Sequence, residues 1–170
     1  MLGGYQSQGL TEYEAKIAVK NALSWWKTKV DYRQYERLPW AIYTDPPLAR
    51  VGMTVDTATN SDRRDLVILQ KYLKTCPQAI LDNTTGGFCQ IVVTRSGRIL
   101  GAEIVGQNAP ELIQILAVAI QQNLKITDLT KFPCLSPTYT EFIYQTAREW
   151  HTYDRDLPQS RRLLNRLCWW

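Results

Sequence analysis

The most regular alternation of apolar and polar positions lies in residues 86–106, which read GGFCQIVVTRSGRILGAEIVG. Between the two alternating runs, the connection TRSGR places Gly97 where a hairpin turn needs a residue with a left-handed backbone. The residues that share one face before and after this turn are Cys89, Ile91, Val93, Leu100, Ala102 and Ile104. Period-two alternation around such a turn predicts a β-hairpin.

Two further stretches predict strands. Residues 40–54, WAIYTDPPLARVGMT, give a short apolar strand that the Pro-Pro pair of residues 46–47 breaks, followed by a turn through Gly52. Residues 65–73, DLVILQKYL, give another strand after a short helix that ends in NSDRR. Because these strands follow one another through short links with no crossover helix, they predict an antiparallel sheet.

Helical periodicity is found before and after the strands. Residues 11–26 repeat apolar side chains at helical spacing, and Thr11 with Glu14 forms a capping-box pattern. Residues 27–39 show no period and are expected to form a linker. After the strands, KITDLTKF predicts a short helical link, and residues 138–150 predict the last regular helix.

The most apolar helix is expected over residues 108–123. Asn108 is a candidate N-cap, with Pro110 in the first turn and Glu111 three residues after the cap. This helix is apolar nearly all round, so we expect the sheet to cover one side and a partner subunit the other. Strands followed by helices predict an α+β fold, an antiparallel sheet flanked by helices.

Length and composition fit one globular domain. The 170 residues are 45% hydrophobic and 21% charged, enough for a substantial core. The longest apolar run is too short to cross a bilayer, and the first residues show no secretory signal pattern. The cysteines are scattered, with no CxxC pair: Cys76, Cys89, Cys134 and Cys168. This spacing predicts structural thiols in a reducing, cytoplasmic setting.

The net charge of +4 does not predict nucleic-acid binding. Much of the excess lies in one cluster near the C-terminus, Arg155, Arg161, Arg162 and Arg166. A nucleic-acid footprint would need a longer basic stripe or a known module, and the sequence has neither. The cluster is therefore interpreted as a solvated basic tail.

The segment SPTYTE, residues 136–141, allows two interpretations. Thr138 can cap the following helix while Glu141 reaches back to the Thr138 amide, which forms a reciprocal capping box. Alternatively, the segment is an active-site motif in which Ser136 replaces a histidine. A serine hydroxyl does not exchange a proton near neutral pH as imidazole does, so capping is favoured. His151 lies roughly 20 Å along the helix, too far to substitute, and is expected to be a cation near the helix C-terminus or a surface residue.

Three stretches taken together carry a family resemblance: PWAIYTDPPLARVGMT, GRILGAEIVGQNAPELIQILAVAI and SPTYTEFI. Over about residues 38–150 the chain resembles the C-terminal dimerisation domain of the pyridine nucleotide-disulfide oxidoreductases, which include glutathione reductase, dihydrolipoamide dehydrogenase and mercuric reductase. The upstream LTEYEAKIAVKNAL is similar to the helix that closes the FAD domain in that family. The resemblance implies an FAD-domain remnant with its linker in residues 1–37, a dimerisation domain in 38–154 and a basic aromatic tail in 155–170.

The resemblance also implies roles for individual residues. The family motif His-Pro-Thr-x-x-Glu reaches into the partner's active site, where the histidine is acid and base to a dithiol and the glutamate orients it. Here Ser136 takes the histidine position, before Pro137 and Thr138, and Glu141 matches the glutamate, so no catalytic residue is expected. The residues expected at the homodimer interface are Leu112, Ile113, Leu116, Ile120, Pro137 and Tyr139.

Cofactor binding is not expected in this chain. It has no G-x-G-x-x-G after a strand for the FAD or NAD pyrophosphate, and the family's redox-active cysteine pair is absent. We therefore expect no oxidoreductase activity from the chain alone. Two functions stay open: a homodimeric assembly module, or the C-terminal part of a split FAD-dependent oxidoreductase completed by a separate flavin-domain chain.

The tail RDLPQSRRLLNRLCWW has no counterpart that we recognise in the family. Its leucines and arginines form a short basic amphipathic stretch ending in Trp169 and Trp170, which suits a membrane interface or a partner groove. The favoured interpretation is that it folds back over apolar surface. Cys168 is a single thiol, a poor chelator of soft metals, so no metal transfer is expected.

Overall fold

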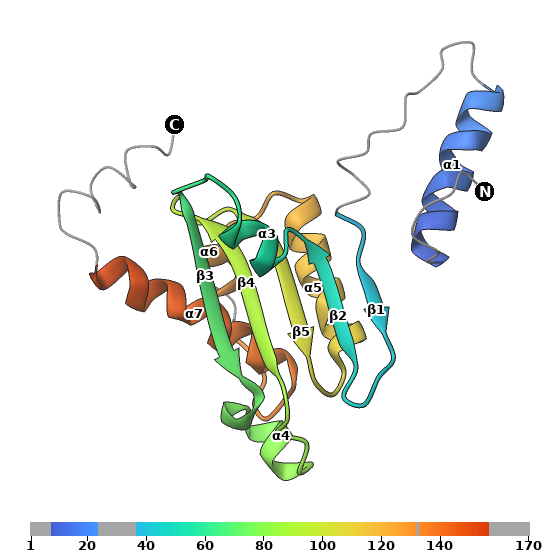
Figure 1. Cartoon of the computed structure of the whole chain (residues 1–170). Helices are drawn as coiled ribbons and strands as arrows, with labels where there is room; N and C mark the ends of the chain where they lie inside the picture. The colour runs from blue at the N-terminus through green and yellow to red at the C-terminus, as the bar shows by residue number, and fades with distance from the viewer. Residues whose placement is uncertain (1–7, 24–36, 132, 157–170) are drawn as a thin grey trace.

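The computed structural model describes residues 8–23, 37–131 and 133–156 (Figure 1). The helices, with the 3-10 turn η1, are α1 (Gln8–Leu23), α3 (Val55–Thr59), η1 (Leu73–Thr75), α4 (Pro77–Leu81), α5 (Ala109–Gln121), α6 (Ile126–Leu129) and α7 (Thr140–Asp156). The strands are β1 (Trp40–Ile42), β2 (Leu48–Gly52), β3 (Leu66–Tyr72), β4 (Phe88–Thr94) and β5 (Ile99–Val105). Residues 27–36 of the predicted linker and the tail beyond residue 156, which includes Cys168, lie outside the described residues.

The five strands form one antiparallel sheet in the order β1-β2-β5-β4-β3. The predicted hairpin is confirmed as β4 and β5, with Gly97 at a φ of 83° in its turn. The sequence predicted one strand broken by prolines near its middle. The structure instead has two strands, β1 and β2, that pair with each other across those prolines.

One residue predicted on the core face of the hairpin does not lie there. The register of β4 and β5 shifts between Val92 and Val93, so Val93 pairs with Ile99. A shift of this kind changes which side chains point to each face. Ile99 is therefore buried in the core, whereas Leu100 is only half-buried. The other predicted core-face residues are confirmed.

Helices cover one face of the sheet, and the core lies between the two layers. Helix α5 packs on β5 and β2, while α7 packs on β3 and β4 (Figure 1). Helix α3 contacts β4 on the opposite face, in front of the sheet in this view. The largest fully buried side chains include Phe142, Leu73 and Ile91. No helix among the described residues is both long and apolar enough to span a bilayer.

Three helix ends differ from the predictions. Helix α1 already includes Gln8, so Thr11 is an interior residue and not its N-cap. Asn108 does occupy the N-cap of α5, but its left-handed backbone, with a φ of 61°, leaves the side chain without a capping hydrogen bond. Helix α7 continues to Asp156, so His151 lies inside the helix and not near its C-terminus.

Candidate functional site

The loop that leads into α7 holds the motif that the sequence singled out. Ser136 and Pro137 are exposed and joined by a cis peptide bond. Thr138 closes the loop, because its hydroxyl donates to the Leu135 carbonyl at 2.8 Å and accepts from the Glu141 amide at 3.3 Å. The hydroxyl of Thr138 therefore caps the start of the helix, as the sequence predicted.

The second half of the predicted capping box is missing. Oε1 of Glu141 accepts a hydrogen bond from the Gln145 side chain at 3.3 Å, one helical turn further on. Oε2 of Glu141 is buried and has no hydrogen-bond partner among the described residues. The reciprocal bond to the Thr138 amide was therefore a wrong prediction, and the carboxylate retains one oxygen free to accept a donor.

Tyr139 anchors this loop to the rest of the domain. Its hydroxyl donates to the carboxylate of Asp82 at 2.8 Å and lies 2.7 Å from the hydroxyl of Thr84. Burial, followed by the neighbouring Asp82, raises the pKa of the Tyr139 phenol. Hydrogen bonds from Gln78 and then from Tyr139 lower the pKa of Asp82. The start of α7 is thus bonded to the turn that follows α4.

Sequence reasoning missed Asp82 and Thr84 as members of this site. Both lie in the DNTTGG turn before β4, 57 and 55 positions from Tyr139. A polar turn of this composition has a local explanation, and no sequence signal links it to Tyr139. They come together because Tyr139 lies against the turn that follows α4.

Three cysteines lie among the described residues, and two of them are buried. Cys76 is buried and its Sγ lies 3.6 Å from the Thr138 carbonyl. Burial raises the pKa of Cys89 to about 12, so its thiolate is not populated near neutral pH. Cys134 is half-buried in the loop itself. The prediction of structural thiols is confirmed for Cys76 and Cys89.

Residues 136–141 contain no histidine, and the one histidine of the sequence is His151. His151 is exposed on α7, and its Nε2 lies 3.2 Å from the hydroxyl of Thr130 on the neighbouring segment. This position agrees with the predicted surface residue. Ser136 occupies the position where the family motif has its acid–base group, and its hydroxyl does not supply one at neutral pH.

Four residues predicted at a dimer interface lie in the core of the chain itself. Leu112, Ile113, Leu116 and Ile120 are at most 4% exposed, because this stripe of α5 packs on the sheet. Within this stretch of helix, Ile115 and Val118 are 37% and 58% exposed. They are three positions apart and thus share one face. A partner that covers this face of α5 would contact these two side chains. Of the other two predicted interface residues, Pro137 is exposed and Tyr139 is half-buried.

The comparison with known families decides what this fold is. The family described as pyridine nucleotide-disulphide oxidoreductase, dimerisation domain, matches residues 38–147. The chain belongs to this family. The boundaries agree with the resemblance found in the sequence over about residues 38–150.

Individual relatives extend this finding. The chain is 33% identical over 115 residues to dihydrolipoyl dehydrogenase 3 of Haloarcula marismortui, covering 67% of this chain and 24% of that protein. It is 33% identical over 157 residues to a mercuric reductase of Staphylococcus aureus, covering 92% of this chain and 27% of that protein. The HOCl-induced flavoprotein disulfide reductase RclA of Escherichia coli superposes with a TM-score of 0.74 at 26% identity, over 84% of this chain and 32% of that one.

The chain spans 24%, 27% and 32% of the length of these relatives, respectively. The second alignment covers 92% of the chain and so extends beyond residues 38–147. The family uses FAD, a dinucleotide whose pyrophosphate is held by a glycine-rich turn between a strand and a helix. The hollow beside Arg37 and Arg98 measures about 250 Å³ and is not preceded by a glycine-rich strand-to-helix turn. It is too small for a dinucleotide, so this hollow does not fit the cofactor.

Proposed function

We propose that this chain is an assembly module that forms a homodimer through the outward face of α5 and the loop that leads into α7. The observation that carries the proposal is the exposure of Val118, at 58%, on a helix whose other apolar side chains are almost all buried. Ile115, at 37% exposed, lies beside Val118, and adjoining exposed apolar side chains on one helix face suit a surface that another subunit covers. The association state in solution tests this proposal.

Family membership supports the proposal, since the matched region is the dimerisation domain. The dimer would use Ile115, Val118 and Pro137 as its apolar contacts, while Leu112, Ile113, Leu116 and Ile120 support the helix from beneath. Rigid support is useful here, because a helix already packed on a sheet loses little conformational freedom on binding.

The module is proposed to catalyse neither thiol–disulfide exchange nor hydride transfer. Ser136 supplies no imidazole, and the chain has no dinucleotide fingerprint or paired redox cysteines. Purified chain mixed with FAD, NADH and a disulfide substrate is expected to show no NADH consumption above a protein-free control. Turnover that scales with protein concentration would contradict this part of the proposal.

A second function is favoured by a specific feature of α1. Val19 and Leu23 are 58% and 85% exposed on this helix. The sequence of α1 is similar to a helix that closes an FAD domain, so a separately encoded flavin-domain chain is a fitting partner. The chain would then be the C-terminal part of a split FAD-dependent oxidoreductase in the cytoplasm. Co-purification of a flavin-containing protein that is lost with Val19→Asp, but retained with the exposed Ile80→Asp, would support it.

A further inference from the structure

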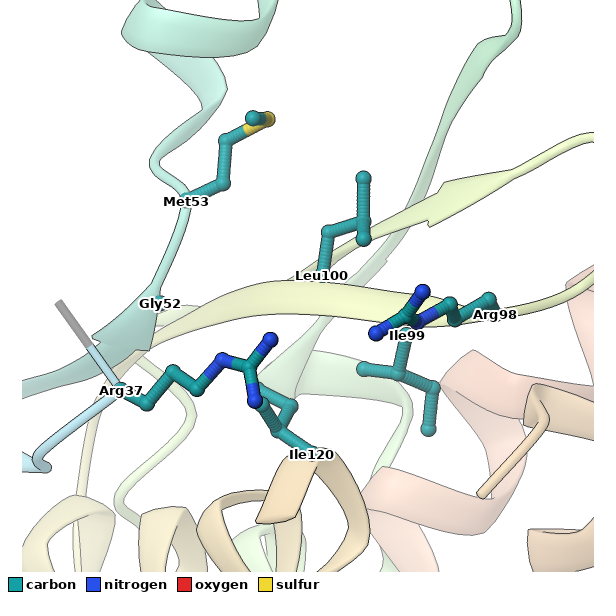
Figure 2. Close-up of a pocket in the computed structure, with 7 residues that line it drawn as sticks. All are labelled: Arg37, Gly52, Met53, Arg98, Ile99, Leu100 and Ile120. Atoms are coloured by element: carbon teal, nitrogen blue, oxygen red, sulfur yellow. The ribbon is translucent and has the colours of Figure 1, made fainter. Parts of the chain in front are cut away.

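A small hollow lies where β2, β5 and the end of α5 meet, and it shares no lining residue with the loop that leads into α7. It measures about 250 Å³. The residues that line it include the apolar Met53, Ile99 and Ile120 (Figure 2). The described domain therefore has a second concave feature, one that the proposed assembly function does not use.

Two arginines give this hollow its charge. The side chains of Arg37 and Arg98 enter from opposite sides, and both guanidinium groups turn into the same space (Figure 2). Among the described residues, no carboxylate lines the hollow, and neither arginine forms a salt bridge with an Asp or Glu. Two like charges that share a partly enclosed space repel each other, and an anion bound between them offsets that repulsion.

Arg98 is held in place before any ligand arrives. Its Nη2 donates to Oδ1 of Asn123 at 2.9 Å, and Asn123 follows the C-terminus of α5. Its backbone amide donates to the hydroxyl of Thr94 at 3.1 Å, and its backbone pairs with Lys125 in an isolated bridge. A fixed guanidinium loses little side-chain entropy when it binds an anion.

We propose that this hollow binds one phosphate-sized oxyanion, either inorganic phosphate or the phosphate group of a small phosphomonoester. The planar forks of Arg37 and Arg98 match the oxygens of such a group and form charge-assisted hydrogen bonds to it. The apolar wall limits the water that competes for those bonds. The volume is below the range of about 300–1,000 Å³ found for larger ligands, so it accommodates one phosphate group and excludes a dinucleotide.

Inorganic phosphate titrated into the full chain at constant ionic strength tests the proposal. Binding is followed by NMR through the arginine Nε–H signals. We expect saturable shifts for Arg37 and Arg98, and a loss of about ten-fold or more in affinity for Arg37→Gln and for Arg98→Gln. The matched control is Arg148→Gln, because Arg148 is exposed on α7 and does not line the hollow. It removes the same charge and is expected to leave the affinity unchanged.

Further arms separate the ligand sources and guard against misfolding. Glycerol phosphate that binds as tightly as inorganic phosphate would indicate a phosphomonoester, and weaker binding would indicate the free ion. Arg98→Lys keeps the charge and loses the fork, so it is expected to lie between wild type and Arg98→Gln. Equal shifts with chloride would mean an adventitious ion only and would overturn the proposal, as would equal weakening by Arg148→Gln. The hollow lies within one chain, so the result does not depend on dimerisation.

Discussion

The hydroxyl of Tyr139 donates a 2.8 Å hydrogen bond to the carboxylate of Asp82, across 57 positions of sequence. Tyr139 directly precedes α7, and Asp82 directly follows α4. The bond therefore holds the loop that carries Ser136 and Pro137 against the turn after α4. Because Pro137 is expected to contact a partner subunit, the position of this loop bears on assembly as well as on stability.

Tyr139→Phe removes the hydroxyl that Asp82 and Thr84 share, while the ring stays packed against the core. We expect the free energy of unfolding to fall by about 1 kcal/mol, the usual net value of such a hydrogen bond. Urea denaturation followed by circular dichroism measures it. The control is Tyr43→Phe. Because Tyr43 is 84% exposed, this substitution should change the free energy of unfolding little. Equal stability of wild type and Tyr139→Phe would show that the bond does not hold in solution.

The pKa of Asp82 gives this contact a pH dependence of known sign. The Gln78 and Tyr139 hydrogen bonds lower the pKa of Asp82 in the folded chain. Its contribution is therefore present above the unfolded pKa, about 3.9, and is lost as pH falls through the lower folded value. Asp82→Asn should thus destabilise the chain at neutral pH, and its difference from wild type should shrink below about pH 4. A difference that stays constant from neutral pH to below the folded pKa would contradict the assignment.

Gly101 allows β5 and the end of β2 to approach closely. A Cβ at Gly101 would stand 2.0 Å from the carbonyl oxygen of Met53, a backbone atom that cannot turn aside. Gly101→Ala is therefore expected to destabilise the fold by about 1–3 kcal/mol. Gly86→Ala is the control, because a Cβ there meets nothing within 4 Å. Thermal unfolding of the two variants beside wild type compares them, and a Gly101→Ala chain as stable as Gly86→Ala would refute the close approach.

Ser136→His tests whether the loop still has the geometry of the family motif. Oε2 of Glu141 is buried without a hydrogen-bond partner in the part of the chain that the structure describes, and it can accept a bond from an imidazole placed before Pro137. A nearby carboxylate favours the protonated ring, so we expect the imidazole pKa to rise above its usual value of about 6.5. NMR titration measures it, with His151 as an internal reference in the same sample. If Glu141→Gln in the same chain leaves the imidazole pKa unchanged, the two side chains do not interact.

The sequence predicted those parts of the fold whose signal is local. The alternation in residues 86–106 predicted β4 and β5, and the apolar stripe of residues 108–123 predicted α5. The placement of Ile99 in the core could not be predicted, because the register shift at Val92 and Val93 depends on how two strands pair. Thr138 as a cap is also a local feature, and it was found.

The parts of the site that escaped prediction depend on contacts distant in sequence. No local sequence pattern around Tyr139 predicts its hydrogen bond to Asp82. Nor does any pattern around Glu141 predict that its carboxylate accepts a bond from Gln145. The apolar character of α5 predicted that two faces need cover, but the residues assigned to the partner face lie on the core face: Leu112, Ile113, Leu116 and Ile120. Ile115 and Val118 are identified as the candidate partner face because the structure shows which side chains of α5 pack on the sheet.

Sedimentation equilibrium of wild type and Val118→Asp tests the central claim most directly. Wild type is expected to sediment at micromolar concentrations with twice the 19.6 kDa mass of the chain. Val118→Asp should raise the dimer dissociation constant about a hundred-fold or more, because it would bury a charge at the interface. Val19→Asp alters a valine of the same exposure, 58%, on α1 and should leave the dimer intact. A monomeric wild type, or a Val118→Asp chain that dimerises as tightly as wild type, would contradict the account.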